Sequence, residues 1–164
     1  MVKKKILDRF GTVVLFSFLI TAVAIPLFDI YSMNSGVFGT ATDYLKGNYT
    51  AGWWNIFFNI GIFVMGIIAV SYYIFNKKHD KSEALAVFLV PYISWIFGVA
   101  DVMFFWIRGK VVPETLPWLM NAKPISDIAL FMGETTVTSN SLLFSALLGT
   151  VIAVSVAYIL KKKF

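Results

Sequence analysis

The sequence contains no cysteine and a single histidine, His79. The lack of cysteine excludes disulfides, thiolate metal sites and cysteine nucleophiles. The lone histidine lies in a lysine-rich segment, which excludes haem held by paired histidines within a membrane and leaves any serine nucleophile without its usual base. We therefore expect no metal and no cofactor, and the motifs identify no catalytic residue.

Charge is also scarce, because only 14% of the 164 residues are charged, against about 25% in a soluble domain. Hydrophobic residues make up 59% of the chain. A helix needs about 20 apolar residues to cross about 30 Å of hydrocarbon, and four runs reach that length. They are residues 11–32, 53–75, 84–107 and 137–160. The fold predicted is a single all-α membrane domain, a bundle of four transmembrane helices.

The distribution of lysine and arginine predicts how the bundle is oriented. Ten of these residues fall in the N-terminus, in the loop after the second run and in the C-terminal tail, and four fall in the two other loops, 33–52 and 108–136. The positive-inside rule therefore places both termini in the cytoplasm. This accounts for the net charge of +5, so we expect a multi-pass protein of the cell membrane with lipids and no nucleic acid as partners. Asn48 opens an Asn-Tyr-Thr glycosylation triplet in an outer loop.

Polar residues within the four runs gather in the half of the membrane away from the termini. Asp101 stands among Val, Ala, Met and Phe, and Arg108 follows two turns later on nearly the same face. An ionised side chain facing lipid is penalised by several kcal/mol, so such residues turn inward. We expect a polar, outward-opening pocket, with Asp101 paired with Arg108. Its expected ligand-binding residues are Asp29, Asn55, Asn59, Asp101, Arg108, Glu134 and Asn140.

A structural interpretation competes with this one. The asparagines can join helices at about 1 kcal/mol each, and Asp101 with Arg108 can form an ion pair near the interface. The fourth run carries a small residue at every fourth position, a pattern that lets a neighbouring helix approach closely, and Gly98 is expected to serve the same purpose in the third run. The packing residues of the fourth run are Ser141, Ser145, Gly149, Ala153 and Ala157.

Three segments resemble the EXPERA group, which includes the sterol delta-8,7 isomerase and the sigma-2 receptor. These are IPLFDIYSM in the first run, DYLKGNYTAGWWNIFFN before and within the second, and ADVMFFWIRG in the third. The resemblance implies a four-helix bundle with cytoplasmic termini and an amphiphile- or sterol-like pocket, with Asp29 and Asp101 at the acidic positions of that group. Asn55 and Asn59 stand in the second run, which lacks the isomerase-type histidine and glutamate, so the resemblance does not imply isomerase catalysis.

The leading functional prediction is that the protein binds a small polar or amphiphilic ligand in the pocket around Asp101. One alternative is a structural or assembly subunit of a membrane complex, whose polar residues hold helices together. Another is a membrane enzyme that acts on a lipid or isoprenoid, with Asp29 and Asp101 as acid and base. Four helices are few for a carrier acting alone, so a homo-oligomer is a further candidate for the assembly.

Overall fold

The computed structural model describes residues 2–35, 51–76, 78 and 80–163, and these residues are helical or lie in turns and loops. Within them, the β-structure is limited to an isolated bridge between Thr115 and Thr138. The elements are α1 (Val2–Leu19), η1 (Ile20–Ala24), α2 (Ile25–Ser35), α4 (Ala51–Phe75), α5 (Lys81–Ile96), α6 (Val99–Ile107), η2 (Pro117–Asn121), α7 (Ile125–Phe131) and α8 (Ser139–Lys163).

Three helical segments are long and apolar enough to cross a membrane: Arg9–Ser32, Phe57–Phe75 and Ser139–Lys163. The first is continuous from α1 to α2 but contains the π-helical turn η1. Pro26 explains this turn, because proline has no backbone N–H to donate one turn back. The backbone N–H of Ile25 instead bonds to the carbonyl of Ile20, so the helix continues through the proline.

The third predicted span, residues 84–107, is divided into two helices rather than one. It consists of α5 and α6, which are bent by 73° at the break between them. Gly98 causes the break: its φ of +86° is left-handed, a conformation that ends helices and that glycine adopts without strain. An added Cβ there would also lie 2.6 Å from a methyl carbon of Leu142. Gly98 therefore ends a helix, in addition to being closely packed.

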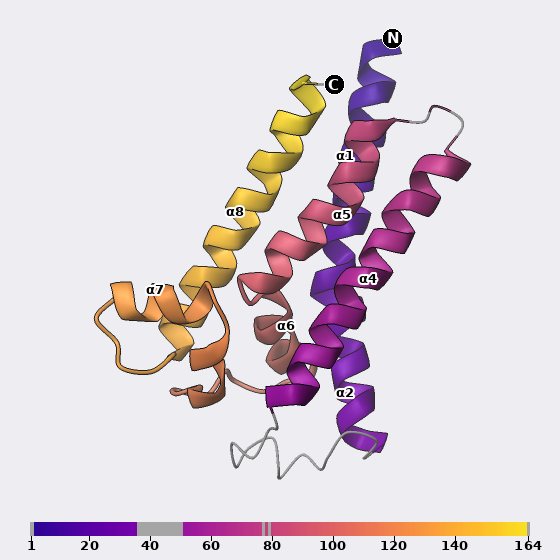
Figure 1. Ribbon diagram of the computed structural model, residues 1–164. Helices are drawn as coiled ribbons and strands as arrows, with labels where there is room; N and C mark the ends of the chain where they lie inside the picture. Colours follow the sequence, from indigo (N-terminus) through magenta and orange to yellow (C-terminus); the bar gives the residue numbers. More distant parts are fainter. Residues whose placement is uncertain (1, 36–50, 77, 79, 164) are drawn as a thin grey trace.

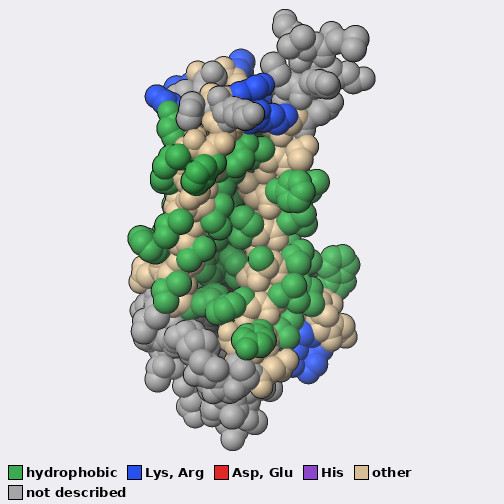
Figure 2. All heavy atoms as spheres, turned by 90° about the vertical axis from the view of Figure 1, so that its right-hand side faces the viewer, with side chains coloured by type: hydrophobic (Ala, Val, Ile, Leu, Met, Phe, Trp, Pro, Cys, Tyr) green, Lys and Arg blue, Asp and Glu red, His purple; other side chains and the backbone are tan. Residues whose placement is uncertain are grey.

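Helix α5 lies at the centre of the bundle and packs against α1, α4 and α8, while α2 packs on α6. Both chain ends lie at the same end of the bundle, and the lower ends of α2 and α6 lie at the opposite end (Figure 1). Apolar side chains cover the α4 side between these two ends, and a group of Lys and Arg side chains lies at the end with the termini (Figure 2). This pattern is typical of a membrane-spanning bundle.

The segment between α6 and α8 forms a small subdomain of its own. Its buried core joins η2, α7 and the start of α8, and α7 runs across the bundle axis beside α8 (Figure 1). The core residues are Leu116, Leu119, Ile125, Ala129, Val137 and Leu142. The predicted loop 108–136 is therefore an ordered, packed structure that contains two short helices. The other predicted outer loop, 33–52, including Asn48, lies almost wholly outside the described residues.

Candidate functional site

Asp101 lies in the first turn of α6, three residues after the break at Gly98. The backbone N–H groups of a first helical turn have no partners within the helix, and the helix dipole favours negative charge there. The carboxylate accepts a hydrogen bond from its own backbone N–H. The break in the span therefore explains how an acidic residue is accommodated within an apolar run.

Asp29 lies on the helix that packs against the helix of Asp101. It lies on α2, close after Pro26, and α2 packs directly on α6. Both side chains are partly buried, and the two carboxyl groups are close enough to interact electrostatically. Two like charges close together repel one another in a medium of low dielectric constant. A positively charged group placed between them would remove that repulsion.

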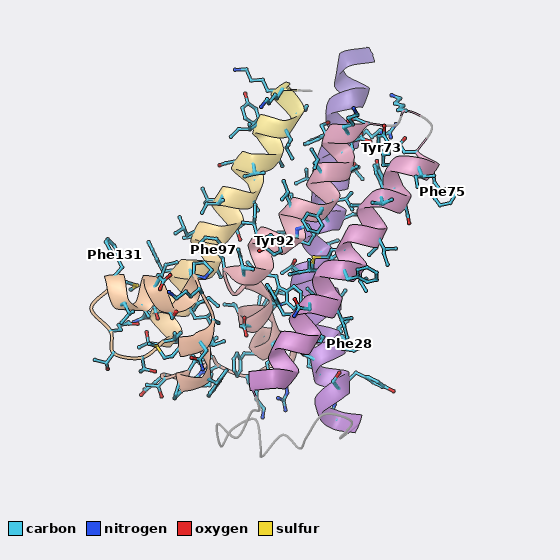
Figure 3. The ribbon with its side chains drawn as sticks, in the orientation of Figure 1. Phe28, Tyr73, Phe75, Tyr92, Phe97 and Phe131 are labelled. Atoms are coloured by element: carbon cyan, nitrogen blue, oxygen red, sulfur yellow. The ribbon has the colours of Figure 1, made fainter. Side chains whose placement is uncertain are left out.

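An aromatic and apolar cluster adjoins the carboxyl pair. Its buried members include Ile25, one turn before Asp29, and Ala100, next to Asp101, together with Met65 and Trp95. Phe57 lies 5.6 Å from Trp95, ring centroid to ring centroid, in an edge-on arrangement. Figure 3 shows Phe28 on α2 beside the lower part of α4, where its ring stacks on Phe57 at 5.5 Å. The cluster thus includes one residue that lies a turn before Asp29 and one that adjoins Asp101 in the chain.

The expected ion pair between Asp101 and Arg108 is absent. Among the described residues the guanidinium of Arg108 lies over the ring of Phe104, 5.3 Å from its centroid, and no ion pair joins it to Asp101. The two residues sit at opposite ends of the short helix α6, about 10 Å apart along its axis. The ring of Phe104, four residues earlier, is nearer and attracts the cation through its π-face.

The other predicted binding residues do not all join the pair. Glu134 lies before α8, where its Oε1 accepts a hydrogen bond from the Thr138 hydroxyl at 2.8 Å. Asn140 is exposed on α8, and Asn59 is exposed on α4. The side chain of Asn55 lies outside the described residues. The structure therefore brings together Asp29 and Asp101, and a role for any of the seven in binding stays a prediction.

Four of the five small residues of α8 line its contact with α5 and with Phe97, the residue that follows α5: Ala153 and Ala157 cluster with Ala86 and Val90, while Ser145 and Gly149 meet Phe97. All five are buried, and α8 packs along α5. The hydroxyl of Ser145 donates to the carbonyl oxygen of Phe97 at 2.9 Å, which satisfies a backbone group freed by the break after α5. Ser141 also exchanges hydrogen bonds with Thr138 across the first turn of α8, an arrangement that caps the helix.

A second polar cluster, which the sequence analysis missed, joins α1, α4 and α5 at the end near the termini. Glu83 is only 3% exposed. Its Oε2 accepts hydrogen bonds from Arg9 at 2.8 Å, from the Tyr72 hydroxyl at 2.7 Å and from the Asn76 amide at 3.1 Å. Arg9 also donates to the Asn76 amide oxygen at 2.7 Å. This cluster ties together the ends of three helices.

A helix-start signal could have placed Glu83 in the first turn of α5, but not its partners. Asp80 followed by Glu83 three residues later is the pattern of a capping box, and Asp80 is indeed the N-cap of α5. Its Oδ1 accepts hydrogen bonds from the Ser82 hydroxyl at 2.7 Å and from the backbone N–H groups of Ser82 and Glu83. Burial by itself would raise the pKa of Asp80, but these hydrogen bonds outweigh it and hold the pKa below its ordinary value.

Among the described residues, no group of three or more His, Asp and Glu side chains is arranged to hold a metal ion. No protein-family model matches the chain, and no curated protein or solved structure is significantly similar to it. The resemblance to the EXPERA group therefore stays a prediction.

Proposed function

We propose that this protein spans the cell membrane four times, with both termini in the cytoplasm, and binds a small amphiphilic ligand in the half of the membrane away from the termini. The observation that carries the proposal is the pairing of Asp29 and Asp101. They come from separate helices, α2 and α6, which pack on each other and whose lower ends lie opposite the termini (Figure 1), and the charge of Asp101 acts on the Asp29 carboxyl group. Paired carboxyl groups beside apolar walls suit a positively charged group attached to an apolar body.

The neighbouring side chains support a cationic ligand. Arg108, the basic residue on the turn after α6, lies over Phe104 rather than against Asp101. A ligand cation would therefore not compete with that arginine for the carboxylate. The cluster of Ile25, Met65 and Trp95 with the stacked ring of Phe57 provides the apolar contact for the rest of the ligand. Ligand pockets commonly combine such apolar lining with a few well-placed polar groups.

Native mass spectrometry of the gently extracted protein tests the proposal. The probes are dodecylamine, a cationic amphiphile, and dodecanol, its neutral counterpart of equal chain length. We expect the wild-type protein to retain dodecylamine in preference to dodecanol, and Asp101→Asn to lose that preference. The matched control is Asp127→Asn, which removes an exposed carboxylate that is paired with Lys123 at 3.5 Å. Equal retention of both probes by the wild type would overturn the proposal.

Assembly with other chains is the second candidate. Asn59 is exposed on α4, within the candidate span Phe57–Phe75. Asparagine side chains join helices within membranes, so this candidate requires a partner chain or a second copy of the chain on this face of α4. The same mass spectrum reports the stoichiometry. A complex that dissociates in Asn59→Leu, with dodecylamine retention unchanged, would support assembly at this face.

A further inference from the structure

The end of α7 carries three exposed apolar residues, which we call the apolar tip: Leu130, Phe131 and Met132. Their exposed fractions are 58%, 88% and 43%. The chain reverses directly after them, at Gly133, whose φ is +79°. The backbone N–H of Gly133 bonds to the carbonyl of Leu130 at 3.0 Å. The apolar tip is therefore held by a hydrogen-bonded turn.

The opposite side of α7 is rigidly supported. Ile125 and Ala129 are 2% and 0% exposed and pack with Leu142 of α8 in the core of the subdomain. An apolar side chain that is left in water costs free energy in proportion to its exposed area. An ordered helix that buries one face and presents Leu, Phe and Met together at its end is typical of a surface with a partner.

The position of the tip indicates which partner this is. Helix α7 runs across the bundle axis beside α8, so the tip projects sideways from the bundle (Figure 1). Phe131 lies at the far end of α7, on the side toward the termini (Figure 3). That direction leads along the bundle axis into the layer that the spans occupy. Helix α7 packs on α8, and α8 carries exposed apolar residues of its own, Leu143, Phe144 and Leu147.

We propose that the apolar tip inserts into the outer leaflet of the membrane and anchors the subdomain between α6 and α8 to the membrane surface. Aromatic and aliphatic side chains at the boundary of headgroups and acyl chains anchor interfacial helices in this way. The exposed ion pair of Lys123 and Asp127 at the other end of α7 suits the hydrated headgroup layer. This inference requires that the spans cross a bilayer, but it does not depend on ligand binding by the carboxyl pair.

Site-directed spin labelling of the full chain in phosphatidylcholine vesicles tests the anchor. Because the sequence has no cysteine, Phe131→Cys introduces a unique label site, and the exposure of Phe131 means that the core is not disturbed. Leu147→Cys on α8 gives the standard for a label in lipid, and Lys78→Cys in a loop gives the standard for a label in water. Asn121→Cys, exposed on η2, is the matched control within the same subdomain.

We expect the label at Phe131 to collide with oxygen much more often than with a water-soluble nickel chelate, as at Leu147. The labels at Asn121 and Lys78 should show the reverse preference. A label at Phe131 that behaves like the one at Lys78 would overturn the proposal. So would low collision rates with both reagents combined with spin–spin broadening, because that result would show a second copy of the chain on the tip. Neither result would bear on dodecylamine binding, so the two proposals fail separately.

Discussion

Glu83 and Asp101 are both carboxylates set among apolar side chains, but their surroundings differ. Glu83 receives three hydrogen-bond donors, one of them the positively charged Arg9. Asp101 lies in the first turn of the short helix α6, where the helix dipole favours negative charge. Its other neighbour is a second carboxyl group, that of Asp29. A carboxylate surrounded by donors is satisfied and structural, whereas a carboxylate facing another carboxylate is short of positive charge. This difference is why we assign binding to the Asp101 end.

Removal of the Glu83 carboxylate should destabilise the protein. Glu83→Ala leaves Arg9, Tyr72 and Asn76 without their shared acceptor. Each buried donor that loses its partner costs about 1–3 kcal/mol of stability. Arg9 is 35% exposed, so water offsets part of the loss. We expect a lower midpoint of thermal unfolding in detergent than for Lys81→Ala, an exposed neighbour on the same helix. Equal midpoints for the two variants would show that the cluster contributes nothing to stability.

Asp80 should make the stability depend on pH. Its pKa in the folded protein is lowered from an ordinary value of 3.8, so the folded state favours the ionised form. The resulting contribution to stability is fully present above the ordinary value and is lost as the pH falls through the lower, folded-state pKa. Asp80→Asn keeps a good N-cap but cannot titrate. The stability difference between wild type and Asp80→Asn should therefore shrink below about pH 4, and a difference that grows on acidification would contradict this assignment.

At the scale of the elements, the main feature is how α5, α6 and α8 fit together. The chain breaks at Gly98, and α8 approaches α5 closely through its row of small residues. The two features share a contact, because Gly149 of α8 meets Phe97, the last residue before the break. A Cβ added to Gly149 would clash with the Cβ of Phe97. An atom so close to the backbone cannot move aside at low cost, so the close approach requires glycine.

Gly149→Ala should therefore weaken the α5–α8 contact. Overpacking of this kind typically costs about 1–3 kcal/mol. The matched control is Gly66→Ala on α4, where an added Cβ would meet nothing within 4 Å and where alanine favours a helix by up to about 1 kcal/mol. We expect Gly149→Ala to lower the thermal midpoint and Gly66→Ala to leave it unchanged or raise it. The opposite order would show that the spacing of α5 and α8 is not set by this residue.

At the scale of the whole molecule, the sequence predicted the helical class and the positions of the apolar segments, because hydropathy alone decides which runs are long enough. The sequence also predicted that Asp29 and Asp101 lie at the same end of the bundle, away from the termini. It did not predict the break at Gly98, since an isolated glycine in an apolar run also fits close helix packing. The Glu83 cluster was missed because Arg9 is 74 residues away from Glu83 in the chain, while Tyr72 and Asn76 lie on the other side of a loop from it. Such contacts arise from tertiary packing, which periodicity does not encode.

The central claim is that Asp29 and Asp101 act together on one cationic group. Equilibrium binding of radiolabelled dodecylamine to the protein in lipid nanodiscs, with empty nanodiscs subtracted, tests it most directly. A hydrogen bond to a charged group is worth about 1.5–3 kcal/mol, so Asp29→Asn and Asp101→Asn should each weaken binding about tenfold or more. One amine would contact both carboxyl groups, so their effects should not be independent. The double variant should therefore lose much less affinity than the product of the two single-variant losses. Wild-type affinity in both single variants would contradict the account.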